Sequence, residues 1–349
     1  MAADDYIPRE MRAAYIERLG PAQAIRYGAL PVPAVGRGEV LVRVMVSAVN
    51  PVDTYIRSGA YPTAISFPFI IGRDLVGEVA RVAEGVTGFA VGQRVWCNSL
   101  GYDGRQGAFA EYATVPQQRL YPLPDGVDPQ QAVAAFHPAA TAYLGLVCHL
   151  GSVHPGMVML VGGAAGNVGS AVTQLAVAMG ARVLATAHGA DDLAWCRASG
   201  ASEVFDYADP QLEAAVRRAA PDGVDVVWNT SGHDDLDLEV GLLARGGRLV
   251  LMAGMEQRPP LPVGPFYTKG ASAVGFTMSS ATVEQLAGAA RATNALLAAD
   301  RLRMRIARAL PLAQAAEAHQ LVEGSGPEGK ATGRVVVLIR GSITPRDDA

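Results

Sequence analysis

The first third of the chain has the hydrophobic pattern of short β-strands. In Gly38–Val49, apolar and other positions alternate, so that every second residue from Val40 to Val46 is a valine on one face. This is the period of a strand with one buried face. Glycine and proline recur between such segments from about Met11 to Pro124, as they do between short strands. The pattern predicts an antiparallel barrel or sandwich in this region.

The pattern changes at about Val127, and from there to about Gly254 apolar runs alternate with helical periods. The runs are mostly uncharged, so both faces of these strands are expected to be buried. Strands that alternate with helices indicate a parallel, doubly wound sheet. The predicted strands are Met157–Val161, Ala181–Thr186, Val204–Phe205, Val224–Trp228 and Arg248–Met252, and the predicted helices are Asn167–Met179, Asp191–Ser199, one after Pro210 and one around Leu236–Leu243.

From about Pro259 onward the pattern is mixed again, and it ends in a predicted strand, Arg334–Ile339. A chain of 349 residues is long enough for about two domains. We therefore predict an α/β protein in which a discontinuous β-rich domain, residues 1–126 and 266–349, contains an inserted dinucleotide-binding domain, residues 127–265.

Composition and charge narrow the class of protein. Half of the residues are hydrophobic and 18% are charged, which suits a packed core and excludes global disorder. The net charge of −4 argues against a protein that binds nucleic acid or an anionic membrane. The three cysteines, Cys97, Cys148 and Cys196, are too few and too widely spaced for a disulfide framework or a CxxC metal site. A reduced, intracellular protein is expected.

Neither a signal peptide nor a membrane span is expected. The N-terminal sequence MAADDYIPREMRAAY is charged and lacks the apolar segment of a signal peptide, so we predict a cytoplasmic location. The stretch between Asp128 and Arg182 contains no charged residue. However, Pro138, Pro155 and several glycines divide it into pieces shorter than the roughly 20 residues that a spanning helix needs.

The turn after the first buried strand has the features of a phosphate-binding loop. It reads VGGAAGNVG from Val161 to Gly169 and opens an apolar helix. Gly166 would let a pyrophosphate approach the backbone, Gly169 would allow close helix packing, and Ala164 stands where the first glycine usually is. Free amides at the helix N-terminus favour phosphate. The alternative is a plain glycine-rich turn. The predicted cofactor contacts in this loop are Ala165, Gly166, Asn167, Val168 and Gly169.

The end of the second parallel strand bears on the choice between NADH and NADPH. An acidic residue there usually binds the free ribose 2′-hydroxyl of NADH. The segment Leu184–His188 contains no acid, which favours NADPH, although Asp191 and Asp192 follow closely.

Several motifs together resemble the quinone oxidoreductase (zeta-crystallin-like) branch of the medium-chain dehydrogenase/reductase superfamily, over about Arg12 to Ile339. The most specific is NPVDTYIRSG, Asn50–Gly59; the others are Gly72-Arg73-Asp74, GAFAEY at Gly107–Tyr112, His137–Tyr143 and the AAGNVG loop. The resemblance implies a GroES-like β-rich catalytic domain, a Rossmann domain, a cleft between them and a homodimer. It also implies hydride transfer to a small-molecule substrate.

Zinc-dependent alcohol dehydrogenases share this superfamily, but their ligands are replaced here. Their Cys–His pair falls on Asn50 and Pro51, their Gly-His-Glu on Gly72-Arg73-Asp74, and their third ligand on His137. One histidine cannot hold a catalytic zinc, which needs about three protein ligands. We therefore predict no metal site; His137 is more simply a wall or helix-start residue.

Hydride transfer to a quinone or an enone puts negative charge on the conjugated oxygen, so a donor placed there lowers the barrier. The resemblance places Asn50 and Tyr55 beside the nicotinamide, with Tyr55 as the preferred proton donor. Asp53 resembles an orienting carboxylate, and Tyr61 a substrate contact. The alternative for both tyrosines is an aromatic cleft wall, and Arg57 is left undecided between site and surface.

Further cofactor contacts come from the resemblance. Tyr207 and Lys330 match residues on the 2′-phosphate side, and Asp192 stands where relatives carry a lysine, which weakens the case for NADPH unless His188 compensates. Tyr207 and Lys330 could equally be structural or surface residues. The remaining predicted cofactor contacts are Thr141, Ala253, Gly254, Phe276 and Thr277. For the last four, packing at the end of a strand is the alternative.

The sequence therefore predicts an NADPH-dependent, zinc-independent reductase of quinones or activated alkenes. Two alternatives stay open: an enoyl-thioester reductase, and a nicotinamide-binding structural or regulatory protein with little turnover. A nucleophilic hydrolase is disfavoured because the chain contains no GxSxG.

Overall fold

The computed structural model describes residues 7–340 except Ser152 and Glu328. Met1–Tyr6, on which the signal-peptide argument partly rests, lie outside the described residues. The chain divides into two compact units, which are described separately. The first unit comprises the residues up to His137 and those from Arg305 onward, and the second unit comprises Pro138–Met304.

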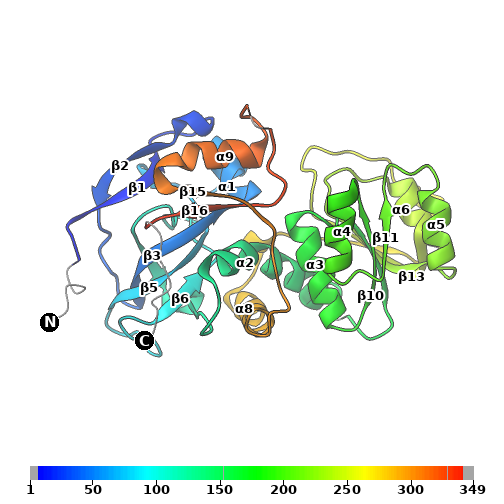
Figure 1. Ribbon diagram of the computed structural model, residues 1–349, viewed down its shortest axis with the longest axis horizontal. Helices are drawn as coiled ribbons and strands as arrows, with labels where there is room; N and C mark the ends of the chain where they lie inside the picture. The colour runs from blue at the N-terminus through cyan, green and yellow to red at the C-terminus, as the bar shows by residue number, and fades with distance from the viewer. Residues whose placement is uncertain (1–6, 152, 328, 341–349) are drawn as a thin grey trace. The chain divides into compact units, whose positions relative to one another are not determined.

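The first unit is built on two sheets (Figure 1). The larger sheet has the order β15-β16-β3-β5-β6-β8, with β7 also paired to β3, and it is antiparallel except for the β15–β16 pair. The smaller sheet has the order β2-β1-β4. The strands are β1 (Glu10–Ile16), β2 (Arg26–Pro31), β3 (Glu39–Val49), β4 (Phe69–Ile70), β5 (Asp74–Val82), β6 (Arg94–Cys97), β7 (Tyr112–Pro116), β8 (Tyr121–Pro122), β15 (Ile306–Pro311) and β16 (Arg334–Leu338).

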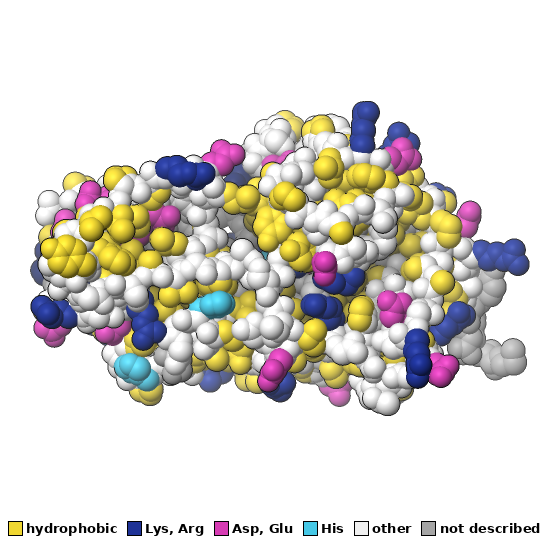
Figure 2. Space-filling view, turned by 180° about the vertical axis from the view of Figure 1, so that it is seen from behind, with side chains coloured by type: hydrophobic (Ala, Val, Ile, Leu, Met, Phe, Trp, Pro, Cys, Tyr) yellow, Lys and Arg dark blue, Asp and Glu magenta, His cyan; other side chains and the backbone are white. Residues whose placement is uncertain are grey.

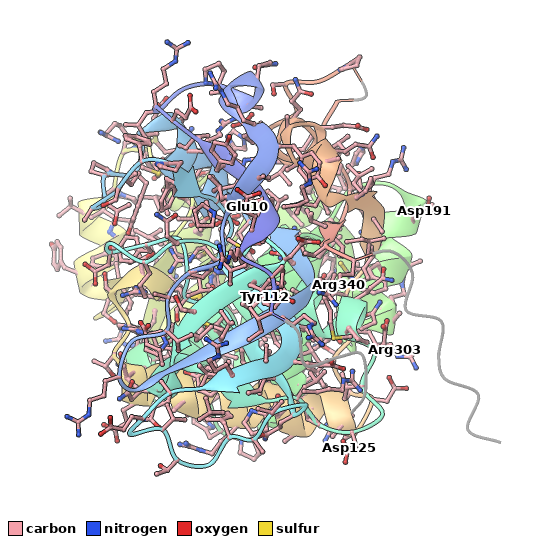
Figure 3. All side chains as sticks on the ribbon, turned by 90° about the vertical axis from the view of Figure 1, so that its left-hand side faces the viewer. Glu10, Tyr112, Asp125, Asp191, Arg303 and Arg340 are labelled. Atoms are coloured by element: carbon pink, nitrogen blue, oxygen red, sulfur yellow. The ribbon has the colours of Figure 1, made fainter. Side chains whose placement is uncertain are left out.

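Helices of the first unit are short, and they connect or cover these strands. They are η1 (Ala22–Ala24), α1 (Pro51–Ser58), η2 (Gln117–Arg119), η5 (Leu312–Gln314) and α9 (Ala315–Glu323). The predicted valine face of β3 is buried: Val40, Val42 and Val44 have no exposed surface. On the face shown in Figure 3, Arg340 lies beside β7, with its Nη2 3.4 Å from the hydroxyl of Tyr112.

The second unit contains one sheet of six parallel strands with the order β11-β10-β9-β12-β13-β14, as the alternation predicted. The strands are β9 (Val158–Gly162), β10 (Arg182–Ala187), β11 (Glu203–Asp206), β12 (Val224–Asn229), β13 (Leu243–Leu251) and β14 (Ser272–Gly275). The helices are α3 (Asn167–Ala178), α4 (Ala190–Ala198), α5 (Leu212–Ala219), α6 (Leu236–Leu242), α7 (Val263–Thr268), the π-helix η3 (Leu144–His149), η4 (Met278–Ser280) and α8 (Val283–Ala298).

The units differ from the expected domain boundaries in two segments: residues 127–137, expected in the dinucleotide-binding domain, belong to the first unit, and residues 266–304 belong to the second. Residues 266–304 were expected in the outer domain, but the structure groups them with the parallel sheet. The physical reason is hydrogen bonding: β14 pairs in parallel with β13, with Val250 opposite Val274. The boundary between His137 and Pro138 falls inside helix α2 (Pro129–Tyr143). Phe136 of this helix stacks on Trp96, also in the first unit, with 3.8 Å between ring centroids.

From the sequence we expected neither a membrane-spanning helix nor a surface that binds nucleic acid. Among the described residues, one helical segment, Pro129–His149, is long and apolar enough to cross a membrane, but 72% of its apolar 18-residue window is buried, as in the core helix of a folded protein. Basic and acidic side chains are interspersed on the face shown in Figure 2, without a broad patch of one sign.

His319 of α9 makes a pH-dependent contribution to stability. It has no exposed surface, and neither ring nitrogen has a hydrogen-bond partner among the described residues. Burial, assisted by the charge of Arg57, lowers the pKa of His319 to about 3. In the unfolded chain a histidine takes up its proton near pH 6.5. The unfolded state therefore binds more protons between these values, and stability falls as the pH falls through that range.

We expect a His319→Leu variant to gain stability relative to the parent as the pH falls. The parent loses about 2 kcal/mol through His319 between about pH 7.5 and about pH 5, and the variant does not. The measurement is urea unfolding of both proteins at both pH values. Taking the difference between the proteins cancels the opposite contributions of shared buried acids such as Asp53. An equal gap at both pH values would show that folding does not lower the pKa of His319, which would contradict this prediction.

Candidate functional site

The loop between β9 and α3 presents backbone amides at a helix N-terminus. The amide of Gly166 donates to the carbonyl of Gly163 at 2.9 Å, and the amide of Ala164 donates to the carbonyl of Thr186 at 2.9 Å. Gly166 is the N-cap residue of α3, and in the described part of the chain no side chain caps this helix. Its first-turn amides and partial positive charge are therefore available to an anion such as a pyrophosphate.

Two glycines of this loop are needed for different reasons. A Cβ on Gly169 would lie 2.4 Å from the Gly163 carbonyl oxygen, so the expected close packing of helix against loop is present and requires glycine. A Cβ on Gly166 would meet only that same oxygen, at 3.1 Å, and Gly166 has an ordinary φ of −70°. Gly166 is exposed, whereas Ala165, Asn167 and Val168 are partly buried. The structure therefore leaves the Gly166 backbone open to a ligand.

Residues after β12 hold the loop from behind. The hydroxyl of Thr230 donates to the carbonyls of Gly162 at 2.9 Å and Gly163 at 3.2 Å. The neighbouring Asn229 donates through Nδ2 to Oε1 of Glu239 at 2.9 Å. Burial raises the pKa of Glu239 to about 7. Nothing in the local sequence pattern marks these supporting residues.

An acidic residue lies beside the end of β10, where the sequence analysis found none. Asp206 ends β11 and pairs in register with Ala187 at the end of β10. Its Oδ1 lies 2.8 Å from Nδ1 of His188, and the rings of His188 and Tyr207 lie 5.3 Å apart. His188 and Tyr207 are therefore neighbours. The sequence signal for Asp206 was its place directly after a predicted strand.

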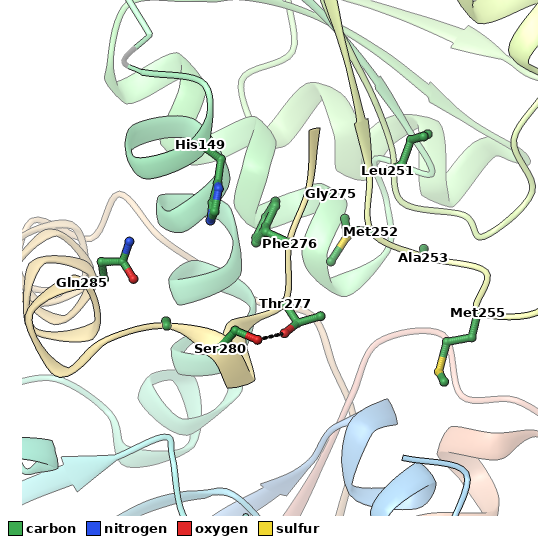
Figure 4. A pocket seen from close by; sticks show the side chains of 11 residues that line it. His149, Leu251, Met252, Ala253, Met255, Gly275, Phe276, Thr277, Ser280 and Gln285 are labelled. Carbon is green, nitrogen blue, oxygen red and sulfur yellow. Dashed lines mark hydrogen bonds between the residues drawn. The ribbon is translucent and has the colours of Figure 1, made fainter. Parts of the chain in front are cut away.

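A cavity of about 660 Å³ lies beyond the ends of β13 and β14 (Figure 4). It brings together the predicted residues Ala253, Phe276 and Thr277. His149, which the sequence analysis did not single out, stacks on Phe276 with 4.7 Å between ring centroids. The Thr277 hydroxyl lies 2.9 Å from that of Ser280. The cavity has apolar walls with a few polar groups, which is the usual composition of a small-molecule site.

In the first unit, Asn50 and Asp53 form a capping box at the start of α1. The backbone amide of Asn50 donates to Oδ2 of Asp53 at 2.8 Å, and Nδ2 of Asn50 lies 3.2 Å from the same oxygen. Such a box satisfies the free amides of a helix start. Asp53 therefore contacts Asn50 as an orienting carboxylate would, and α1 has a fixed beginning.

Asn50 is also part of a buried polar cluster with Asp74, Arg334 and Arg73. Its Nδ2 donates to Oδ2 of Asp74 at 2.9 Å, and its Oδ1 accepts from Nη2 of Arg334 at 2.9 Å. Arg334 Nη2 lies 3.7 Å from Asp74 Oδ2. Burial raises the pKa of Asp53 to about 6 and that of Asp74 to about 7, against the lowering effect of the two arginines. The Asn50 side chain is thus held by three neighbours.

Tyr55 and Tyr61 differ in their surroundings. Tyr55 projects from α1 with 41% of its surface exposed. Tyr61 is partly buried, its ring centroid 6.0 Å from that of Tyr102. Tyr102 in turn lies under the guanidinium of Arg73 at 5.1 Å. Arg57, undecided from the sequence, is buried and ion-paired with Glu323, so it is a structural residue.

His137 does not lie in a cluster of metal ligands. Within the described residues, no group of three or more His, Cys, Asp or Glu side chains is arranged to hold a metal ion. Burial, together with the charges of Arg73 and Arg334, holds the pKa of His137 well below 6.5. Two buried guanidinium groups beside this histidine disfavour a divalent cation.

The other predicted residues lie in both units. Thr141 is buried in α2, and Gly254 has a φ of +74° in the loop after β13. Lys330 is exposed in the segment before β16 of the first unit. The second unit therefore carries the phosphate loop, the His188 pair and the cavity, and the first unit carries Asn50, Asp53, both tyrosines and Lys330.

Comparisons with known proteins agree with this division. Residues 36–125 match the family model described as alcohol dehydrogenase GroES-like domain, and residues 167–292 match that described as zinc-binding dehydrogenase. The chain is 33% identical over 327 residues to quinone oxidoreductase of Mus musculus, covering 92% of this chain and 96% of the relative.

Solved structures of similar proteins differ in the cofactor they name. A mycobacterial protein complexed with NADPH is 30% identical, with a TM-score of 0.81, over 94% of this chain and all of that chain. A structure described as an NAD-dependent alcohol dehydrogenase is 31% identical, with a TM-score of 0.84, over 95% of this chain and all of that chain.

Proposed function

The chain belongs to the quinone oxidoreductase branch of the medium-chain dehydrogenase/reductase superfamily, and we propose that it transfers a hydride from NADPH to a quinone or an activated alkene. It is an oxidoreductase with a GroES-like and a Rossmann-type domain that acts on a small molecule. The observation that carries the proposal is the open Gly166 backbone at the uncapped N-terminus of α3. A dinucleotide pyrophosphate fits both its shape and its charge.

Bound NADPH would supply the hydride. The residues that fit it are the phosphate loop, His188 and Tyr207 on the 2′-phosphate side, and Ala253, Phe276 and Thr277 along the cavity wall. Thr141, Gly254 and Lys330 complete the proposed contacts. Two observations oppose a strict preference for NADPH: Asp192 in the first turn of α4, and the newly identified Asp206.

Tyr55 is the proposed proton donor to the substrate oxygen, because its side chain is exposed on a helix whose start is fixed. We assign Asn50 and Asp53 the positioning of α1, since the Asn50 side chain is already held by Asp53, Asp74 and Arg334. Tyr61 is proposed as a substrate contact beside Tyr102. A donor held where negative charge develops stabilises the transition state.

The test is a turnover assay of the purified protein with NADPH and NADH against quinones, enones and enoyl thioesters. We expect oxidation of NADPH in the presence of quinones or enones. We also expect elemental analysis to find no stoichiometric zinc, and treatment with EDTA to leave the rate of this oxidation unchanged. Loss of activity with metal removal would overturn the zinc-independent part of the proposal.

The outcomes of this assay separate the proposals. Turnover with enoyl thioesters alone would identify an enoyl-thioester reductase, and cofactor binding without turnover would identify a structural or regulatory protein.

A Tyr55→Phe variant is expected to lose at least about tenfold in kcat, because general acid catalysis contributes on that scale or more. The homodimer implied by the resemblance, and the cytoplasmic location expected from the N-terminal sequence and the few cysteines, are part of the same proposal.

A further inference from the structure

The end of β10 carries a base and an acid in direct contact. Nδ1 of His188 lies 2.8 Å from Oδ1 of Asp206, and both side chains are partly exposed, at 57% and 33%. The same Asp206 oxygen accepts from the amide of Ala208 at 2.9 Å. The hydrogen bond from His188, followed by that from the amide of Ala208, lowers the pKa of Asp206. Asp206 is therefore an ionised acceptor at neutral pH.

This contact determines which proton His188 keeps. An ionised carboxylate accepts hydrogen bonds and donates none, so Nδ1 of His188 carries a hydrogen in the pair. When His188 is neutral, its Nε2 is an acceptor; when His188 is protonated, Nε2 becomes a donor and the ring is a cation. A proton taken up by the pair thus reverses both the charge of the ring and the hydrogen-bonding character of Nε2.

The two ribose groups that distinguish the cofactors need opposite partners at this place. The 2′-hydroxyl of NADH is bound by an acidic residue beside the end of the second strand, whereas the 2′-phosphate of NADPH needs a cation or donors. Asp206 supplies an acid there from the neighbouring strand, in register with Ala187. His188 supplies the cation only when it is protonated.

We propose that His188 and Asp206 together determine the choice between NADPH and NADH, and that this choice shifts towards NADPH as the pH falls. The protonated His188 ring receives the 2′-phosphate through Nε2, while Asp206 holds the ring and balances its charge. With neutral His188, the Asp206 carboxylate repels the phosphate and accepts from the 2′-hydroxyl of NADH. The inference rests on the proposed use of a nicotinamide cofactor.

The other charged and titratable groups around His188 do not reverse this trend. Tyr207, the residue directly after β11, lies with its ring beside the ring of His188. Asp191 and Asp192 lie in the first turn of α4, and Asp191 is at the surface in Figure 3. Both aspartates add negative charge, which disfavours the 2′-phosphate at every pH where they are ionised. The pH-dependent part of the preference is thus assigned to His188.

The test measures binding rather than turnover. Dissociation constants for NADPH and NADH are obtained by fluorescence titration from about pH 8 to about pH 6, and the same is done by calorimetry with adenosine 2′,5′-bisphosphate and AMP. We expect the ratio Kd(NADH)/Kd(NADPH) of the parent protein to rise about tenfold over this range, because a proton gives the His188 ring a positive charge and turns its Nε2 into a donor to the 2′-phosphate.

Protonation of the 2′-phosphate itself, whose second pKa is about 6, weakens NADPH binding as the pH falls and so opposes the expected trend. Three variants separate the effect of His188 from that of the phosphate. His188→Gln should leave the ratio flat or falling as the pH decreases. Asp206→Asn should tighten NADPH and weaken NADH at about pH 8, where the carboxylate acts without a charged partner. Asp191→Asn removes one charge nearby without touching the pair, and it should keep the pH dependence of the parent.

The outcomes are distinct. A ratio that is independent of pH in the parent, or an equal pH dependence in the parent and in His188→Gln, overturns the proposal while the cofactor assignment stands. If neither dinucleotide binds at any pH, the proposed function itself fails, and the inference fails with it.

Discussion

An Arg334→Met variant is expected to lose about 3 to 5 kcal/mol of stability at about pH 8. Breaking a buried ion pair by removing one partner leaves an uncompensated charge, which is the costly case. Arg334 is 1% exposed and Asp74 has no exposed surface, so water cannot replace the missing guanidinium. Arg334 also donates to Asn50, whose Oδ1 loses that partner. The measurement is the free energy of unfolding in urea.

The loss should shrink as the pH falls. Burial already raises the pKa of Asp74 to about 7, and Arg334 opposes that rise. Without Arg334 the carboxyl is protonated more readily, and a neutral Asp74 no longer needs a cation. A group whose folded pKa is raised loses stability as the pH rises, so the variant is closest to the parent at about pH 6.

The matched control is the double variant Arg334→Met, Asp74→Asn. It replaces the carboxylate by an amide of the same shape, so no charge is left unpaired in the cluster. We expect it to recover at least about 1 kcal/mol relative to Arg334→Met, because contacting residues are not additive. A double variant no more stable than Arg334→Met would show that Asp74 does not depend on Arg334.

Gly166→Val is expected to weaken dinucleotide binding by at least about 100-fold, which corresponds to about 2.7 kcal/mol. The side chain would stand where a pyrophosphate must approach the exposed backbone of Gly166 at the start of α3. The fold should survive with a loss of about 1 kcal/mol, since the position has an ordinary φ and a poor N-cap residue costs about that much.

The control for this loop variant is Gly264→Val in the same unit. A Cβ there would meet nothing within 4 Å, so we expect the parent's stability and the parent's cofactor affinity. Both variants are titrated with NADPH by fluorescence and unfolded thermally. Unchanged affinity in Gly166→Val would mean that the pyrophosphate binds elsewhere.

The parallel sheet was predictable because its strands are apolar on both faces. The expected strand Val224–Trp228 ends one residue before β12 does, and the expected strand Ala181–Thr186 is displaced by one residue from β10. The strand β14 could not be predicted from the sequence, because it has only four residues, most of them exposed, and they do not form an apolar run. That omission is why residues 266–304 were expected in the wrong unit.

Site features whose residues are close together in the sequence could be predicted, and contacts between distant residues could not. The phosphate loop could be predicted because its turn, its glycines and its helix are consecutive. Asp206 was missed because it reaches the end of β10 through strand pairing, which local pattern does not reveal. Arg334 was missed as a partner of Asn50 because 284 residues separate them. Asn50 could be predicted to matter, but its role depends on these distant contacts.

The discontinuity of the first unit also has a consequence for the order in which the chain matures on the ribosome. Strand β16 lies between β15 and β3, so the large sheet is completed only after the last described strand has emerged. The second unit is continuous in sequence, and domains generally fold as units during synthesis. Pro138–Met304 can therefore fold while β3 still has an open edge facing its missing neighbour. A nascent chain stopped before Arg334 would contain an assembled parallel sheet in its second unit and, in its first unit, an aggregation-prone strand edge and an Asp74 without the guanidinium of Arg334. Chaperones that recognise unpaired strands have their longest opportunity in that interval.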